Sequence, residues 1–157
     1  MERYPMTQEC YNKLKEELEY LKKVERPKVV KDIAEARAHG DLSENAEYDA
    51  AKNRQGMIEA KISQIETKLS RAIIVNPATL KTDKVAFGLL VTVLDLNTDE
   101  ETTYQIVSED EADVSKGKIS YTSPIGKALI GKAAGEIVKI QVPAGIKELE
   151  VISIDKP

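Results

Sequence analysis

Two apolar stripes with helical spacing constrain the fold of this chain more than any other feature. The first recurs at intervals of three and four residues, and its members are Tyr11, Leu14, Leu18 and Leu21. The second has the same spacing and consists of Ile58, Ile62, Ile65, Leu69 and Ala72. Stripes this narrow are typical of helices that pack against a single partner helix. Two such helices in one short chain predict an antiparallel hairpin in which each stripe covers the other.

The stretch Gly40–Asp49 joins these two helices, and we call it the acidic stretch because it is rich in carboxylates and poor in apolar side chains. The first helix is expected over Thr7–Ala38 with Thr7 as its N-cap, which gives a length of about 48 Å at about 1.5 Å per residue. Pro27 removes a backbone hydrogen bond, so we expect a kink or a short break near Val24–Pro27. The acidic stretch then lies at the far end of a long hairpin.

Beyond the proline, the first stripe is expected to resume at Val30, Ile33, Ala34 and Arg37. Gly40 then ends the first helix, as glycine commonly does just after a helix. The second helix is expected to begin between Ser43 and Ala46, with Ser43 as a suitable cap, and to end near Ile74. Residues 1–76 are therefore predicted to form a coiled-coil hairpin domain.

After residue 76 the apolar spacing changes from about 3.5 to about 2 residues, which is typical of strands. Asn76-Pro77-Ala78-Thr79 has the composition of a linker, which we place at residues 77–79. Residues 80–157 are predicted to form a small α+β domain with an antiparallel sheet. Strands are expected at 91–96, 102–107, 119–121, 137–142 and 148–154, and one short helix at 125–130, with Ser123 as its N-cap and Pro124 at its first position.

Charge and cysteine content exclude several classes of protein. The formal net charge is −4, and Cys10 is the only cysteine. A chain with no net positive charge is not a general nucleic-acid binder, because neutralisation of phosphates drives such binding. A single cysteine allows neither an intramolecular disulfide nor a cysteine-based metal cluster. No segment has the pattern of a membrane span or a signal peptide, so we expect a soluble, cytoplasmic protein.

Asp41 and Glu44 are candidate metal ligands within the acidic stretch. Two carboxylates three residues apart around a helix start can face the same way and share a Mg²⁺ ion. Spacing alone favours the simpler interpretation, a solvated turn with a helix cap. Two carboxylates are also too few for a dedicated Mg²⁺ site, because Mg²⁺ keeps several waters and needs further oxygen ligands. A functional pair must therefore complete a site that another macromolecule largely holds.

Three basic residues, Arg37, Lys52 and Arg54, flank the acidic stretch on the two helices and are candidates for a local phosphate-binding patch. Acidic residues interleave with them, so spacing alone favours an ordinary mixed-charge helix surface. His39 is the only histidine and has no nucleophile nearby, so we assign it no catalytic role.

Three segments carry a family resemblance: Ala34–Lys52, Phe87–Asp95 and Ser123–Lys132. They closely resemble the GreA/GreB family of bacterial transcript cleavage factors, and the similarity extends over essentially the whole chain. The resemblance implies an N-terminal all-α antiparallel coiled-coil hairpin and a C-terminal α+β domain similar to the FK506-binding fold. It also implies a transcription elongation factor that is not an enzyme by itself and meets DNA only indirectly.

In that family the C-terminal domain docks at the rim of the RNA polymerase secondary channel, and the hairpin enters the channel. The resemblance assigns docking to Ser123, Pro124 and Ile125. It places Asp41 and Glu44 beside the catalytic centre, where they help to hold the second Mg²⁺ and to orient the attacking water. The polymerase then hydrolyses the RNA of a backtracked complex.

The resemblance also assigns Arg37 and Lys52 to a basic patch near the nascent RNA 3′ segment. It implies that the chain binds no cofactor alone and holds Mg²⁺ only jointly with the polymerase. RNA polymerase and the nascent RNA are the expected partners. We expect a monomer with no membrane contact and no small-molecule substrate.

The alternative function is that of a binding-only occupant of the secondary channel, which inhibits polymerase and needs no correctly spaced pair of acids. A prolyl isomerase needs an aromatic-lined pocket, but Phe87, Tyr104 and Tyr121 are the only aromatic residues beyond residue 76. A holdase chaperone favours an exposed apolar hairpin end, whereas this one is acidic.

Overall fold

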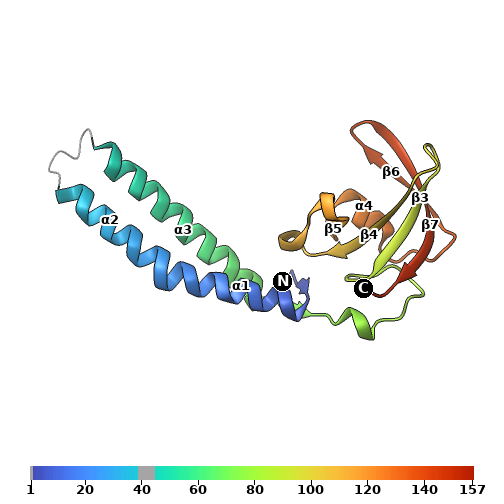
Figure 1. Ribbon diagram of the computed structural model, residues 1–157, viewed down its shortest axis with the longest axis horizontal. Coiled ribbons are helices and arrows are strands. Elements are labelled where there is room, and N and C mark those ends of the chain that lie inside the picture. Colours follow the sequence, from blue (N-terminus) through green and yellow to red (C-terminus); the bar gives the residue numbers. More distant parts are fainter. Residues whose placement is uncertain (1, 39–44) are drawn as a thin grey trace. The chain divides into compact units, whose positions relative to one another are not determined.

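The computed structural model describes residues 2–38 and 45–157, which divide into two compact units (Figure 1). The first unit is formed by Glu2 and Tyr11–Ala72, and the second combines Arg3–Cys10 with Ile73–Pro157. Arg3–Cys10 thus group with the C-terminal unit and not with the helical residues that follow them. Within the described ranges, no helix is long and apolar enough to cross a membrane.

The first arm of the hairpin is a continuous helical run with three parts. Helix α1 (Gln8–Tyr20) leads into a π-helical turn (Leu21–Glu25), and helix α2 (Arg26–Ala38) follows directly. A π-helical turn lengthens the backbone hydrogen-bond step from four residues to five. The break expected near Pro27 is therefore a π-helical turn that ends just before the proline.

This turn shifts the apolar stripe of α2. Val30, which is expected on the stripe, is 51% exposed, whereas Val29 is only 2% exposed. The buried residues of α2 are Val29, Ile33 and Ala36. An unbroken helix would continue the series Tyr11, Leu14, Leu18 and Leu21 to positions 28, 32 and 35, and the one extra residue of the π-helical turn moves these to 29, 33 and 36. The stripe of α2 therefore contains Ile33, as expected, but the expectation of Val30, Ala34 and Arg37 is wrong, because all three are exposed.

The second arm is helix α3 (Ala46–Ser70), which runs antiparallel to α2 and packs against it (Figure 1). Its buried residues are Ala51, Ile62 and Ile65. The helix ends at Ser70 and does not reach Ile74, because Ala72–Ile74 forms strand β2 and pairs with β1 (Tyr4–Met6). The two β-branched isoleucines favour this extended conformation.

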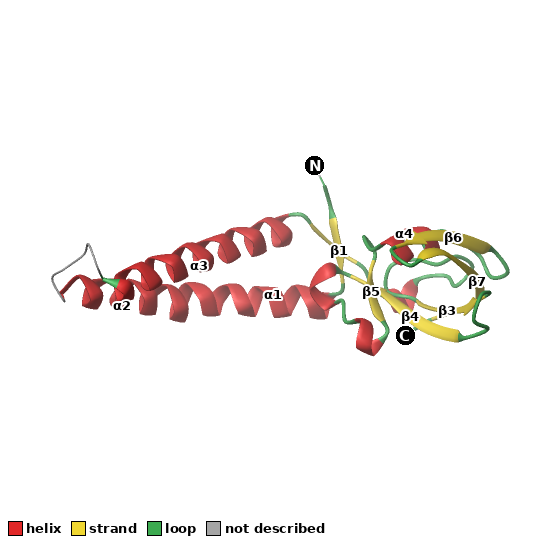
Figure 2. Cartoon of the chain, turned by 90° about the horizontal axis from the view of Figure 1, so that it is seen from above, coloured by secondary structure: helices red, strands yellow, loops and turns green. Residues whose placement is uncertain are grey.

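The second unit is built on a five-stranded sheet with the order β5-β4-β3-β7-β6 (Figure 2). Its strands are β3 (Leu90–Asp95), β4 (Glu101–Val107), β5 (Lys118–Ser120), β6 (Ile137–Val142) and β7 (Gly145–Asp155). All neighbours are antiparallel except β4 and β5, which are parallel. The expectation of a fully antiparallel sheet is therefore wrong at β5. Two 3₁₀ turns lie between β4 and β5, so the chain makes a crossover there and not a hairpin.

Helix α4 (Pro124–Leu129) and the sheet share one apolar core in the second unit. Its buried members are Val85, Leu89, Val91, Val93, Ile106, Ile119, Leu129, Val138, Ile140, Leu149, Val151 and Ile154. The predicted architecture, a helical hairpin followed by an α+β unit with one short helix, is confirmed.

The N-terminal segment is anchored within the second unit by polar contacts. The Thr7 hydroxyl caps α1 by accepting a hydrogen bond from the Cys10 backbone N–H at 3.1 Å, and it also donates to Glu111 Oε1 at 3.4 Å. The Cys10 Sγ lies 3.6 Å from the hydroxyl of Ser108, which is itself buried. Burial of the thiol raises the pKa of Cys10 to about 11.

We expect native Cys10 to resist alkylation near neutral pH, because the side chain is 3% exposed and the reactive species is the thiolate. The folded-state pKa of about 11 lies above the unfolded value of 9.0. The stabilisation that comes from the neutral thiol is therefore complete below the unfolded value and is lost as the pH rises through the folded value. Mass spectrometry after iodoacetamide treatment, with and without denaturant, measures the protection. Equal alkylation rates in the two conditions contradict it.

Candidate functional site

Asp41 and Glu44, the acids predicted to hold Mg²⁺ jointly with the polymerase, lie outside the described residues, as does His39. The structure describes the two helix ends that flank them in sequence. These are the last turn of α2 and the first turn of α3, and both belong to the hairpin unit.

Asn45 connects these two helix ends. Its side-chain oxygen accepts a hydrogen bond from the Tyr48 backbone N–H at 3.0 Å, so Asn45, and not the expected Ser43, is the N-cap of α3. Its side-chain nitrogen donates to the Ala36 carbonyl at 2.6 Å. The last carbonyls and first N–H groups of helices lack partners within their own helix. One amide therefore satisfies such a group on each helix.

Arg37 and Tyr48 make a second contact across the helix ends. The Arg37 Nη2 lies 3.5 Å from the Tyr48 hydroxyl, and its guanidinium carbon lies 5.7 Å from the centre of the ring, within the range of a cation–π interaction. The hydrogen bond from Arg37, together with the charges of Arg37 and Lys52, lowers the pKa of the Tyr48 phenol. Arg37 and Lys52, the two residues of the predicted basic patch, thus both act on Tyr48.

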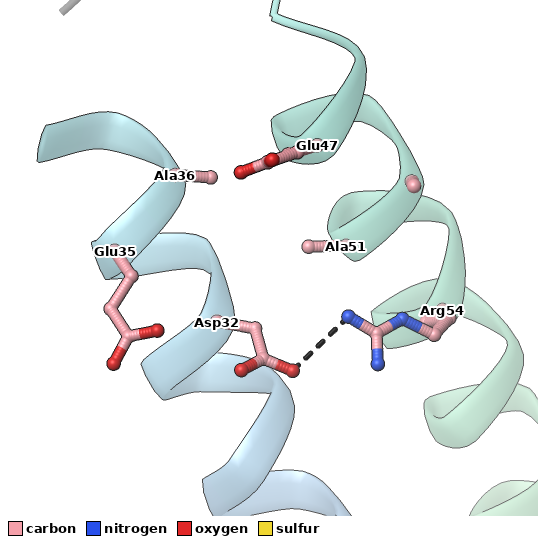
Figure 3. A pocket seen from close by; sticks show the side chains of 7 residues that line it. Asp32, Glu35, Ala36, Glu47, Ala51 and Arg54 are labelled. Carbon is pink, nitrogen blue, oxygen red and sulfur yellow. Dashed lines mark hydrogen bonds and ion pairs between the residues drawn. The ribbon is translucent and has the colours of Figure 1, made fainter. Parts of the chain in front are cut away.

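The third basic candidate is engaged differently. Arg54 Nη2 forms an ion pair with Asp32 of α2 at 3.1 Å, which Figure 3 shows spanning the two helices. Lys52 is exposed, and its Nζ donates to Gln55 Oε1 at 3.3 Å. The charge of Arg54 is therefore matched within the hairpin, and Arg37 and Lys52 are better placed to meet a phosphate.

A depression of about 410 Å³ lies between α2 and α3 (Figure 3). It is lined by Asp32, Glu35, Ala36, Glu47, Ala50, Ala51 and Arg54. Ala36 and Ala51 are almost fully buried, so small side chains form the floor and charged side chains form the rim. Among the residues that the structure describes, no three His, Cys, Asp or Glu side chains are grouped to hold a metal ion.

The predicted docking residues surround the start of α4. The Ser123 hydroxyl accepts a hydrogen bond from the Gly126 N–H at 3.1 Å and donates to the Ser120 carbonyl at 2.7 Å. Ile125 packs against the core of the second unit, whereas Pro124 is exposed. Of the three predicted residues, Pro124 is thus available for contact, and Ser123 and Ile125 hold the helix that presents it.

Ser123→Ala is expected to lower the stability of the second unit by about 1 kcal/mol, the usual cost of losing a side-chain N-cap. Ser123→Thr keeps a capping hydroxyl and serves as the matched control. Urea denaturation of the three proteins gives the comparison. Identical midpoints for wild type and Ser123→Ala contradict the capping role of this hydroxyl.

Comparison with known proteins identifies the family. Residues 4–74 match the family model described as "Transcription elongation factor, N-terminal", and residues 80–156 match "Transcription elongation factor, GreA/GreB, C-term". The chain belongs to the GreA/GreB family. It is 61% identical over 150 residues to transcription elongation factor GreA of Pelobacter propionicus, which covers 96% of this chain and 95% of the relative. The GreA factor of Neisseria meningitidis is 53% identical over 155 residues, or 98% of each chain.

Solved structures are also similar. A crystal structure of GreA factor homolog 1 of Thermus thermophilus is 30% identical and covers 98% of this chain and 99% of its own, with a TM-score of 0.47. The predicted resemblance is thus confirmed by the sequence relatives, and this GreA/GreB chain is a transcription elongation factor.

Asn45 and Tyr48 are the two residues of this hairpin end whose roles were missed from the sequence. The cap had a visible signal, since Asn is a preferred N-cap and stands directly before the helix. No sequence signal indicated the hydrogen bond from Asn45 to Ala36 or the contact of Tyr48 with Arg37. Both depend on which residues of α2 lie opposite the start of α3.

Proposed function

We propose that this GreA/GreB factor binds RNA polymerase through the secondary channel and stimulates the polymerase's own endonucleolytic cleavage of backtracked nascent RNA. One observation carries the proposal. A chain that matches the family over nearly its full length has Asp41 and Glu44 between two helix ends that Asn45 joins. The long hairpin is suited to reach a recessed catalytic centre.

The roles of the two acids follow from the coordination chemistry of Mg²⁺. Mg²⁺ prefers six oxygen ligands and usually binds through one or two carboxylates together with substrate phosphates and waters. Asp41 and Glu44 supply two carboxylates, and the polymerase and the RNA supply the remaining ligands. When bound, the ion stabilises the attacking and leaving oxygens of the displaced phosphodiester. The acids orient the attacking water, and the hydrolysis takes place in the polymerase.

Arg37 and Lys52 contribute attraction to RNA in this scheme. Both charges are near enough to Tyr48 to lower the pKa of its phenol, and both residues are close in sequence to the acids. A short basic patch on a chain of net charge −4 attracts a nearby RNA segment without promoting general DNA binding. The partners are RNA polymerase and the nascent RNA of the same complex, so we place the factor in the cytoplasm and expect it to act as a monomer.

Reactivation of arrested complexes tests the proposal. Complexes stalled in a backtracked state are incubated with the factor and then supplied with nucleotides. We expect a larger fraction to resume elongation, together with released short RNAs that carry the original 3′ end. Slower nucleotide addition without any released RNA contradicts cleavage stimulation and supports the alternative of an inhibitory channel occupant.

A further inference from the structure

We propose that Asn45 is a positioning residue that clasps the end of α2 to the start of α3 and thereby sets the separation of the two helix ends that flank Asp41 and Glu44 in the sequence. The effect on Asp41 and Glu44 rests on the function proposed above, whereas the clasp itself is a property of the hairpin. Asn45 is therefore more than a helix cap, because its side chain also bonds to the opposite helix.

The first argument is the direction of its two hydrogen bonds. The amide oxygen accepts from Tyr48 of α3, and the amide nitrogen donates to the Ala36 carbonyl of α2. A carboxamide is planar and has its donor and its acceptor on different atoms, so this one orientation satisfies both partners. The two bonds, at 3.0 and 2.6 Å, thus fix the separation of the helix ends.

The second argument is that apolar packing is weak at this end of the hairpin. The buried residues nearest to the acidic stretch are Ala36 and Ala51, at 2% and 1% exposure. Alanine removes little apolar area from water, and the hydrophobic stabilisation scales with that area. The larger stripe residues, Ile62 and Ile65, lie further along α3. Polar contacts must therefore hold the helix ends together, and the bond from Asn45 to the Ala36 carbonyl is one of them.

One substitution at Asn45 removes the hydrogen bond to Ala36 of α2 but keeps the N-cap of α3. Asn45→Asp keeps an oxygen acceptor for the Tyr48 N–H, and Asp caps helices about as well as Asn. The same change replaces the donor to Ala36 by a carboxylate oxygen, which is repelled by the carbonyl. Asn53→Asp introduces the same charge at an exposed position of α3 and is the matched control.

The functional experiment uses the full-length chain and a backtracked polymerase complex. At saturating factor, Asn45→Asp is expected to lower the maximal rate of stimulated cleavage by about tenfold or more, since small displacements of reacting groups have effects of this size. It should also raise the Mg²⁺ concentration needed for half-maximal rate and leave the half-saturating factor concentration unchanged. Asn53→Asp should behave as wild type. A loss that appears only as weaker factor binding, or equal behaviour of the two variants, overturns the positioning role.

A distance measurement tests the clasp without reference to cleavage. Spin labels at Glu35→Cys and Asp49→Cys, in a Cys10→Ser chain, report the separation of α2 and α3, because both labelled positions are exposed. We expect Asn45→Asp to broaden the distance distribution and Asn53→Asp to leave it unchanged. An unchanged distribution in Asn45→Asp overturns the inference. If wild type releases no RNA but the distribution broadens, the proposed function fails and the clasp stands.

Discussion

Asp41→Asn and Glu44→Gln are each expected to slow stimulated RNA cleavage by about a hundredfold, which corresponds to about 3 kcal/mol of lost transition-state stabilisation. Each change keeps the shape of the side chain but replaces an anionic ligand by a neutral amide. Mg²⁺ strongly prefers carboxylate oxygens, so the shared site loses affinity and the attacking water loses its orientation. Binding to polymerase should be unaffected, because neither change touches α4 or the sheet.

The control for this prediction is Asp49→Asn, which removes an exposed acid from the first turn of α3 in the same hairpin. It should retain nearly the wild-type cleavage rate. The Asp41 and Glu44 variants should also compete with wild type for the polymerase and thereby slow its cleavage. An equal loss in all three variants shows a general effect of negative charge and contradicts a specific ligand role.

Ile65→Ala is expected to destabilise the hairpin by about 2–5 kcal/mol, the range seen for truncation of large buried aliphatic residues. Ile65 is 1% exposed and lies at the centre of the stripe that α3 presents to the first arm. Met57→Ala in the same helix is the control, because Met57 is 72% exposed and surface changes usually stay within about 0.5 kcal/mol.

Chemical denaturation followed by helical circular dichroism measures both changes, since most of the helical signal comes from the hairpin. Similar midpoints for the two variants contradict a hairpin held by its apolar stripe. A large loss of stability for Met57→Ala alone shows that the opposite face of α3 packs against the first arm.

Features that depend on a few neighbouring residues were predictable from the sequence. The Thr7 cap, the Ser123 cap and the buried pair Ile62 and Ile65 each follow from local spacing and local hydrogen bonds. The strands of the second unit also follow, because alternation of apolar and polar residues identifies a strand without knowledge of its partner.

Features that depend on a distant partner were not predictable in the same way. The π-helical turn at Leu21–Glu25 moves the stripe by one residue, and no local motif specifies that insertion. Strand β2 ends α3 early because β1 is available for pairing. The parallel placement of β5 and the bond from Asn45 to Ala36 likewise depend on how distant segments meet.

The candidate site was likewise only partly predictable from local sequence patterns. Spacing alone favours a solvated turn for Asp41 and Glu44 and an ordinary charged surface for Arg37 and Lys52. Their functional roles came from the family resemblance and not from spacing. The structure adds that Arg37 is held against Tyr48, a contact that joins the two arms of the hairpin.

Release of RNA fragments in three parallel mixtures tests the central claim, that this chain stimulates a hydrolysis performed by RNA polymerase. The mixtures are a backtracked complex alone, the same complex with the factor, and free RNA with the factor, all in Mg²⁺. The account predicts slow release in the first, much faster release in the second and none in the third. Equal rates in the first two mixtures, or cleavage of the free RNA, contradict it.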